Sequence, residues 1–154
     1  MRHPDLPLEG GCRCGRIRLR LSAPPLATFA CHCTGCQRMS SSAYSLSAMV
    51  PSDGFELLSG EPVRGGLKGS GIHHFFCPDC MSWLFTRWEG MDGLVNIRPT
   101  MLDETSWFAP FIETYTSEKL AFAETGARRS YPRFPEETDF PVLLQAYARA
   151  VSGG

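Results

Sequence analysis

The sequence predicts a mainly β domain, built from antiparallel strands, with a short helix near its C-terminal end. Three observations predict this class. One segment alternates strictly between apolar and charged residues, and many short apolar runs are separated by turns that use the chain's 15 Gly and 12 Pro. The last apolar run instead has helical spacing. Short strands followed by one helix are typical of a β domain rather than of an alternating α/β fold.

The first expected strand covers residues 16–21. Ile17, Leu19 and Leu21 point to one face and three arginines to the other, the pattern of a half-buried strand. The Pro pair at 24–25 ends it, and a short strand over 26–30 leads to the next motif. Residues 37–42 are expected to form one or two helical turns.

The middle of the chain contains most of the other expected strands. Residues 44–50 form a strand that ends at the turn sequence Pro-Ser-Asp-Gly. The glycines at 65–66 and 69–71 indicate a flexible loop. The remaining expected strands are 55–58, 63–64, 72–76, 83–87, 94–98, 111–115 and 120–122.

The C-terminal segment changes period. Apolar residues recur at 143, 144, 147, 148 and 151, and Pro141 precedes them, which predicts a helix over about 141–151. A chain of 154 residues is expected to form a single domain over 1–154 that buries about 69% of its unfolded surface. Such a domain can form a hydrophobic core without the support of disulfides or metal ions.

Charge and hydropathy exclude several partners. The net charge is −1, so nothing draws the chain as a whole to nucleic acid or to anionic lipid. The alternating arginines 16, 18 and 20 are expected to form a solvated strand face. No apolar run approaches the length of a membrane span, and the first residues do not resemble an export signal. We therefore expect a cytoplasmic protein without nucleic-acid or membrane partners.

The seven cysteines are the most informative residues. Their number is odd, so they cannot all form disulfides, and in a reducing compartment clustered cysteines are more often metal ligands or catalytic groups. They form two Cys-x-Cys and two Cys-x-x-Cys pairs. The positions are Cys12, Cys14, Cys31, Cys33, Cys36, Cys77 and Cys80.

Two of these pairs fit a closed zinc site. The turn Cys77-Pro78-Asp79-Cys80 has the form of a zinc knuckle, and Cys12 and Cys14, flanked by glycines, can supply the other two thiolates. Four thiolates leave no open position, so this site would be structural. The alternative pairing of 12/14 with 33/36 remains open.

The other three cysteines can hold a second ion with one open position. Cys31, Cys33 and Cys36 lie within six residues. A zinc with three thiolates is a weak Lewis acid that suits a soft fourth ligand, so the chemistry indicated is activation of a substrate thiol. The alternatives are three metal-free thiols, or His32 as a fourth ligand. We favour a packing role for His32, because adjacent residues on a short loop rarely reach one ion. Arg38 could meet an anionic substrate or be solvated.

These motifs resemble one known family. The runs Gly-Gly-Cys-x-Cys-Gly at 10–15, Cys-His-Cys-x-x-Cys-Gln-Arg at 31–38 and Phe-Cys-x-x-Cys at 76–80 resemble the glutathione-dependent formaldehyde-activating enzymes, a family that includes centromere protein V. The resemblance covers about residues 8–122 and makes the C-terminal helix an extension. It implies an Mss4-like zinc-binding β fold with two zinc ions. The structural zinc would be on Cys12, Cys14, Cys77 and Cys80, and the labile or catalytic zinc on Cys31, Cys33 and Cys36.

The resemblance also implies an activity. The family's reaction joins glutathione and formaldehyde to give S-(hydroxymethyl)glutathione, a carbon–sulfur lyase activity, so the expected partners are glutathione or a related thiol and a small electrophile. The alternatives are lyase-like activity on another thiol adduct, or a non-catalytic zinc-stabilised binding module. A redox enzyme would need a reactive Cys outside the metal sites, and the Glu motif of zinc deaminases is missing.

One departure from the family concerns the knuckle. Met81 follows Cys80 where the family usually has Gly, so we expect the turn to lack a residue with positive φ.

Overall fold

The computed structural model describes residues 1–67, 69 and 71–153, and it contains two β-sheets. The smaller sheet has the order β1 (Leu8–Gly11), β2 (Arg18–Leu21) and β5 (Phe55–Ser59). The larger sheet has the order β11-β10-β3-β4-β9-β8-β7-β6. Its strands are β3 (Ala27–Cys31), β4 (Ser45–Pro51), β6 (Val63–Gly65), β7 (Ile72–Phe76), β8 (Trp83–Trp88), β9 (Leu94–Ile97), β10 (Ile112–Thr114) and β11 (Arg129–Ser130). The predicted mainly β class is confirmed.

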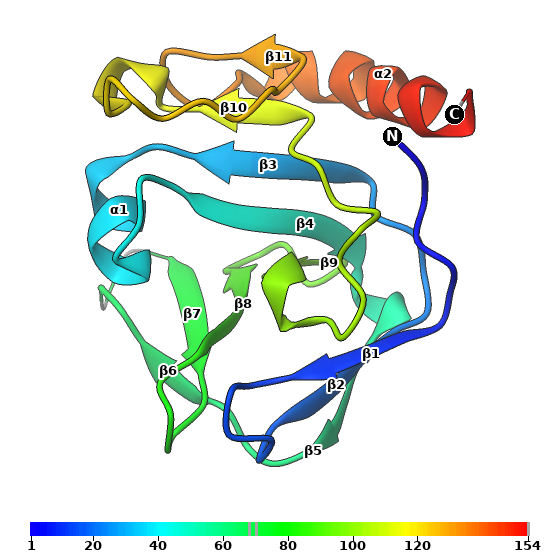
Figure 1. The fold of residues 1–154 in the computed structure, drawn as a ribbon, viewed down its shortest axis with the longest axis vertical. Helices are drawn as coiled ribbons and strands as arrows, with labels where there is room; N and C mark the ends of the chain where they lie inside the picture. Colours follow the sequence, from blue (N-terminus) through cyan, green and yellow to red (C-terminus); the bar gives the residue numbers. More distant parts are fainter. Residues whose placement is uncertain (68, 70, 154) are drawn as a thin grey trace.

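Two α-helices flank the larger sheet (Figure 1). Helix α1 (Thr34–Ser40) follows β3, and α2 (Phe140–Ser152) packs against β3 near the β11 end of the larger sheet. The 3-10 turns are η1 (Ser52–Gly54), η2 (Pro99–Met101), η3 (Thr116–Glu118) and η4 (Glu137–Asp139). Neither of these α-helices, within the described residues, is long and apolar enough to cross a membrane.

The alternating segment forms a half-buried strand, as predicted. Ile17, Leu19 and Leu21 are fully buried beneath the small sheet. On the outer face, Arg20 bonds Glu9 at 2.7 Å and Arg18 bonds Asp103 at 2.7 Å. These arginines therefore pair with surface carboxylates, and such exposed pairs contribute about 0–1 kcal/mol each.

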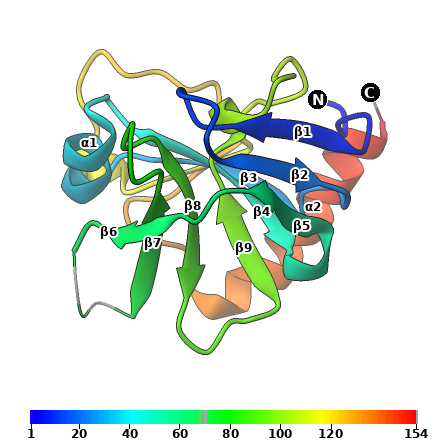
Figure 2. The same cartoon turned by 90° about the horizontal axis from the view of Figure 1, so that it is seen from below.

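Strand β4 separates two apolar cores. Its residues Ala48 and Val50 pack in the core between the two sheets, together with Leu19. Met49, which points the other way, packs in the core beneath α2, beside Tyr147. Figure 2 shows the small sheet crossing one side of the larger sheet while α2 covers another part. Because both faces of β4 are covered, its register is fixed from both sides.

The larger sheet is not wholly antiparallel. Strand β10 runs parallel to β3, with Ile112 opposite Phe29, and also parallel to β11. Two strands joined by a tight hairpin must be antiparallel. Because β3 and β10 are far apart in the sequence and are not joined by a hairpin, they can run parallel.

Three other elements differ from the expectation. Strand β1 was not predicted, because its two glycines weaken the strand pattern. A Cβ at Gly10 would lie 2.0 Å from the Met101 carbonyl oxygen, so this strand needs glycine for close packing. The predicted strand at 120–122 is wrong: the segment is irregular and Phe122 is 77% exposed. The edge strand β11 is short and exposed, and it carried no apolar signal. Part of the predicted glycine loop, at residues 68 and 70, lies outside the described residues.

Candidate metal centre

Four cysteines from two distant turns meet at one point. The β1–β2 loop supplies Cys12 and Cys14, and the β7–β8 turn supplies Cys77 and Cys80. Their sulfur atoms all lie within 4.8 Å of one another, with Cys12 Sγ 3.4 Å and Cys77 Sγ 3.7 Å from Cys14 Sγ. In a tetrahedral Zn–S₄ site with bonds of about 2.3 Å, the sulfurs would be about 3.8 Å apart. The donor set therefore fits zinc without rearrangement.

Backbone groups support this four-cysteine cluster. The Ile17 N–H donates to Cys12 Sγ at 3.3 Å. Burial opposes ionisation of Cys12, but this hydrogen bond and those with the Cys14 and Cys77 thiols outweigh it and lower the pKa of Cys12. The Ser82 hydroxyl lies 3.2 Å from Cys80 Sγ and is the main cause that lowers the pKa of Cys80 to about 5. Thiols with lowered pKa give up their protons readily to a metal.

The knuckle turn corrects one expectation. Met81 has a φ of 55°, the left-handed conformation that favours glycine. Its N–H donates to the Cys77 carbonyl at 3.1 Å and closes the turn. A residue with a side chain costs about 1–2 kcal/mol in the left-handed conformation, and the turn keeps its shape despite this cost.

The other three cysteines form a second cluster. Cys31 ends β3, Cys33 lies in the loop and Cys36 lies in α1, and their sulfurs are within 4.8 Å of one another. Cys33 is the N-cap of α1, because its Sγ accepts from the Cys36 N–H at 3.3 Å. This cap begins the helix at Thr34, three residues earlier than predicted. No histidine or carboxylate among the described residues joins either cluster.

The three thiols share charge unequally. Hydrogen bonds from Cys31 and Cys36 lower the pKa of Cys33 far below its ordinary value. The same contacts with Cys31 and Cys33 raise the pKa of Cys36. Without a metal the cluster therefore takes one negative charge easily and resists further ionisation, whereas a divalent cation would displace the remaining protons.

His32 packs the loop and does not join the cluster, in agreement with the favoured interpretation. It is fully buried, its Nε2 lies 3.1 Å from Glu113 Oε2, and its ring meets Tyr44 edge to face. Glu113 also accepts hydrogen bonds from Lys119, Thr125 and Ser130. The residue between two of the cysteines is thus anchored to β10.

Glu113→Gln should destabilise the protein by about 2 kcal/mol at pH 7. Burial raises the pKa of Glu113, but hydrogen bonds from Ser130, Thr125, Lys119 and His32 outweigh it and lower the pKa from 4.5 to about 2. A depressed carboxyl pKa stabilises the fold above pH 4.5, and this contribution disappears as the pH falls toward 2.

Urea unfolding of the wild-type and Glu113→Gln proteins should therefore show a difference in the free energy of unfolding that is constant from pH 5 to 7 and smaller below pH 4.5. The exposed Glu124→Gln is the control. A Glu113→Gln protein within 0.5 kcal/mol of wild type at pH 7 would contradict this prediction.

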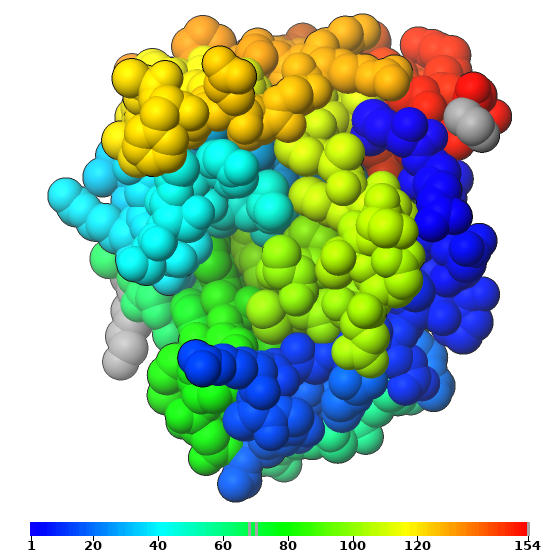
Figure 3. All heavy atoms as spheres, viewed as in Figure 1, coloured from blue at the N-terminus to red at the C-terminus, as the bar shows by residue number. Residues whose placement is uncertain are grey.

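A pocket of about 340 Å³ is bordered by residues that neighbour both cysteine clusters. Ser45 borders it and stands opposite Cys31 in the β3–β4 register, and Ser40, also in its wall, donates to the Cys36 carbonyl at 2.7 Å. Met81 of the knuckle borders it as well. Figure 3 shows the hollow where the cyan, green and yellow-green parts of the surface meet. The rest of the lining is Met39, Ser42, Tyr44, Leu46, Trp83, Arg98, Thr100 and Met101.

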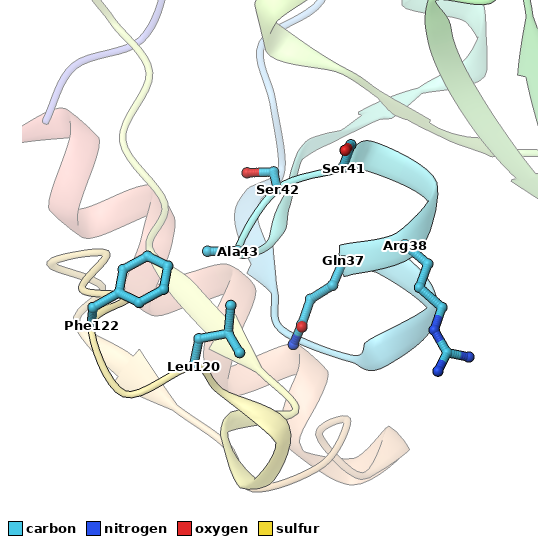
Figure 4. Close-up of a pocket in the computed structure, with 7 residues that line it drawn as sticks. All are labelled: Gln37, Arg38, Ser41, Ser42, Ala43, Leu120 and Phe122. Carbon is cyan, nitrogen blue, oxygen red and sulfur yellow. The ribbon is translucent and has the colours of Figure 1, made fainter.

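A more open hollow, of about 520 Å³, lies beside α1. Figure 4 shows Gln37 directed toward Leu120, while Arg38 extends away from Phe122. The Gln37 amide donates to the His32 carbonyl at 2.7 Å and to the Glu118 carbonyl at 3.0 Å. Gln37 is thus engaged in holding the cysteine loop, and Arg38 is exposed to solvent.

Sequence reasoning missed Arg98 as a residue of the site. Arg98 follows directly after β9, lines the pocket and is only 7% exposed. The expected strand over 94–98 ends at Arg98, and alternation with the apolar Val95 and Ile97 gives no signal for its burial.

The fold has a solved counterpart. A crystal structure of a Rhodobacter sphaeroides protein, determined as a structural genomics target, matches with a TM-score of 0.52 at 15% identity. The match covers 62% of this chain and 87% of that one, and it shows similarity of fold alone.

The family comparison extends to the sequence itself. The profile of the glutathione-dependent formaldehyde-activating enzymes matches residues 7–118, which include all seven cysteines. This chain therefore belongs to the family of glutathione-dependent formaldehyde-activating enzymes.

Proposed function

We propose that the protein is a zinc-dependent carbon–sulfur lyase that makes and breaks S-(hydroxymethyl)glutathione or a similar glutathione adduct. Family membership supports a glutathione-related role. The observation that carries the proposal is the three-cysteine cluster. Its sulfurs converge with no fourth ligand among the described residues. Cys31 stands opposite Ser45 and the Cys36 carbonyl accepts from Ser40, and both serines belong to the pocket wall.

The donor set decides which chemistry fits. Zinc held by three thiolates supplies one further position that favours a thiolate over hydroxide. Cys31, Cys33 and Cys36 would hold the ion, and the Glu113–His32 contact keeps their loop in place. Trp83 and Leu46 give the pocket apolar walls, which would limit water around the reacting sulfur.

The reaction balances without any oxidant. The glutathione S–H bond breaks, its sulfur forms a bond with the formaldehyde carbon, and the carbonyl oxygen takes up a proton to become a hydroxyl. The reverse direction breaks the same C–S bond. Ser45 and Tyr44 carry hydroxyl groups at the pocket and could pass this proton.

The test starts with zinc per chain and then uses cobalt. We expect two zinc ions in the purified protein. With Co²⁺ in the three-cysteine cluster, glutathione should change the sulfur-to-cobalt absorption bands, and S-methylglutathione, which lacks the thiol, should not. The protein should also speed the exchange between formaldehyde and S-(hydroxymethyl)glutathione, measured by NMR against the uncatalysed rate.

Two outcomes would count against the proposal. Identical cobalt spectra with both glutathiones would mean that no thiol enters the metal site. Exchange no faster than the uncatalysed reaction, despite thiol binding, would favour a zinc-stabilised binding module or a different thiol adduct.

A further inference from the structure

We propose that Arg98 supplies the positive charge that balances the three-cysteine centre. It would stabilise the negative charge that the three thiolates, and a thiolate ligand in the fourth position, place around a metal ion there. This inference rests on the metal site of the proposed function. It concerns a residue outside the seven cysteines.

Arg98 is a buried cation without a carboxylate partner among the described residues. Its guanidinium stacks 3.5 Å from the centre of the Trp83 ring, and it donates to the Leu46 carbonyl at 3.0 Å and to Thr86 Oγ1 at 2.6 Å. Its Nε is buried and has no hydrogen-bond partner in the described part of the chain. These neutral contacts satisfy part of the guanidinium but do not balance its charge, and an unbalanced buried charge is strongly unfavourable.

The balancing charge is at the cysteine cluster. Arg98 donates to the Leu46 carbonyl, and the preceding residue, Ser45, stands opposite Cys31 in the β3–β4 register and borders the same pocket as Arg98. Once a metal ion has displaced the thiol protons, the negative charges of Cys36 and Cys31 would act on Arg98. Three thiolates on a divalent cation carry a net charge of −1, which one guanidinium neutralises. A thiolate in the fourth position makes the net charge −2, so a fixed positive charge nearby favours its binding.

Arg98 carries the single positive charge among the described residues that line the pocket, since it alone of them is ionisable to a cation. His74 lies close by, with Nδ1 2.9 Å from Thr86 Oγ1 and its ring against Trp83. Burial first, and then Arg98, lower the pKa of His74 to about 4, so this imidazole is neutral at pH 7.

Arg98 stays charged under the same conditions. Burial lowers its pKa to about 9, and the charges of Cys36 and Cys31 oppose that change. Thr86 can accept from Arg98 and donate to His74, so one hydroxyl contacts both residues. The arrangement is a built cationic position rather than a chance burial.

The test measures metal affinity directly. The Zn²⁺ affinity of the three-cysteine centre is determined by competition with a chelator. Arg98→Met should weaken it at least tenfold, Arg98→Gln, which can still donate a hydrogen bond, should weaken it similarly, and Arg98→Lys should recover most of the loss. The one zinc of the four-cysteine cluster and the circular dichroism spectrum should be unchanged, which shows that the variants fold.

Two controls separate charge from structure. Arg87→Met removes the same charge from the same region of the sheet, and Thr86→Val removes a hydrogen-bond acceptor of Arg98 but leaves its charge. Both should keep the zinc affinity within about threefold of wild type. Folded Arg98→Met and Arg98→Gln proteins with wild-type affinity would overturn the proposal.

Ligand choice distinguishes the remaining outcomes. The cobalt-loaded protein is titrated with 2-mercaptoethanol, a thiol without carboxylates, and with glutathione. The counter-charge role predicts weaker binding of both in Arg98→Met. A loss confined to glutathione, with unchanged metal affinity, would overturn the inference and make Arg98 a carboxylate-binding residue. A wild-type protein that binds no second metal would instead refute the proposed function.

Discussion

Cys77→Ser should prevent the protein from folding stably. Cys77 is fully buried in the turn between β7 and β8, and its sulfur lies 3.7 Å from that of Cys14. The four-cysteine cluster therefore joins the small sheet to the large one at the edge of their shared core. Because metal binding and folding are coupled in such sites, losing one ligand should cost several kcal/mol, comparable to the whole stability of a typical domain.

The measurement is soluble yield, zinc content and thermal unfolding. Cys77→Ser should be insoluble or unfolded, without a cooperative transition at 37 °C. Asp79→Ser is the matched control, because Asp79 lies in the same turn, is exposed and forms only a surface ion pair with Arg16. A soluble Cys77→Ser protein with a native-like transition and a full zinc content would show that the cluster is not structural.

The cysteine grouping was accessible from sequence because each pair lies on one tight loop. Local spacing brings Cys77 and Cys80 together, and counting then leaves Cys31, Cys33 and Cys36 as the second set. In the structure the members of each set lie close together, and the two sets form separate clusters. The occupancy of both sets by zinc stays a prediction.

Other parts of the site depend on contacts that no local pattern records. Glu113 reaches His32 across 81 residues, because β10 returns parallel to β3. Arg98 follows an alternating strand, where alternation predicts a solvent-facing side chain. That rule assumes one exposed face, and it fails here because α1, η2 and the knuckle turn build a pocket over that face. Phe122 shows the opposite failure, an apolar residue left exposed beside a hollow.

Cys33→Ser should empty the three-cysteine centre and leave the fold intact. Cys33 has two roles: its sulfur is one of three converging ligand atoms, and it caps α1 by accepting from the Cys36 N–H. Serine is a good N-cap but a poor zinc ligand, so this substitution separates the two roles. We expect zinc to fall from two to one per chain, with loss of the glutathione-dependent cobalt spectrum and of formaldehyde exchange.

Cys33→Ala completes the comparison, because it removes the cap as well as the ligand. It should lose the same zinc ion and be about 1 kcal/mol less stable than Cys33→Ser in urea unfolding. Equal stability of the two variants would mean that the cap contributes nothing. If Cys33→Ser lost both zinc ions and unfolded, the division into a structural and a labile centre would be wrong. In that case all seven cysteines would act as one folding unit, and the open coordination position proposed for the substrate thiol would lose its basis.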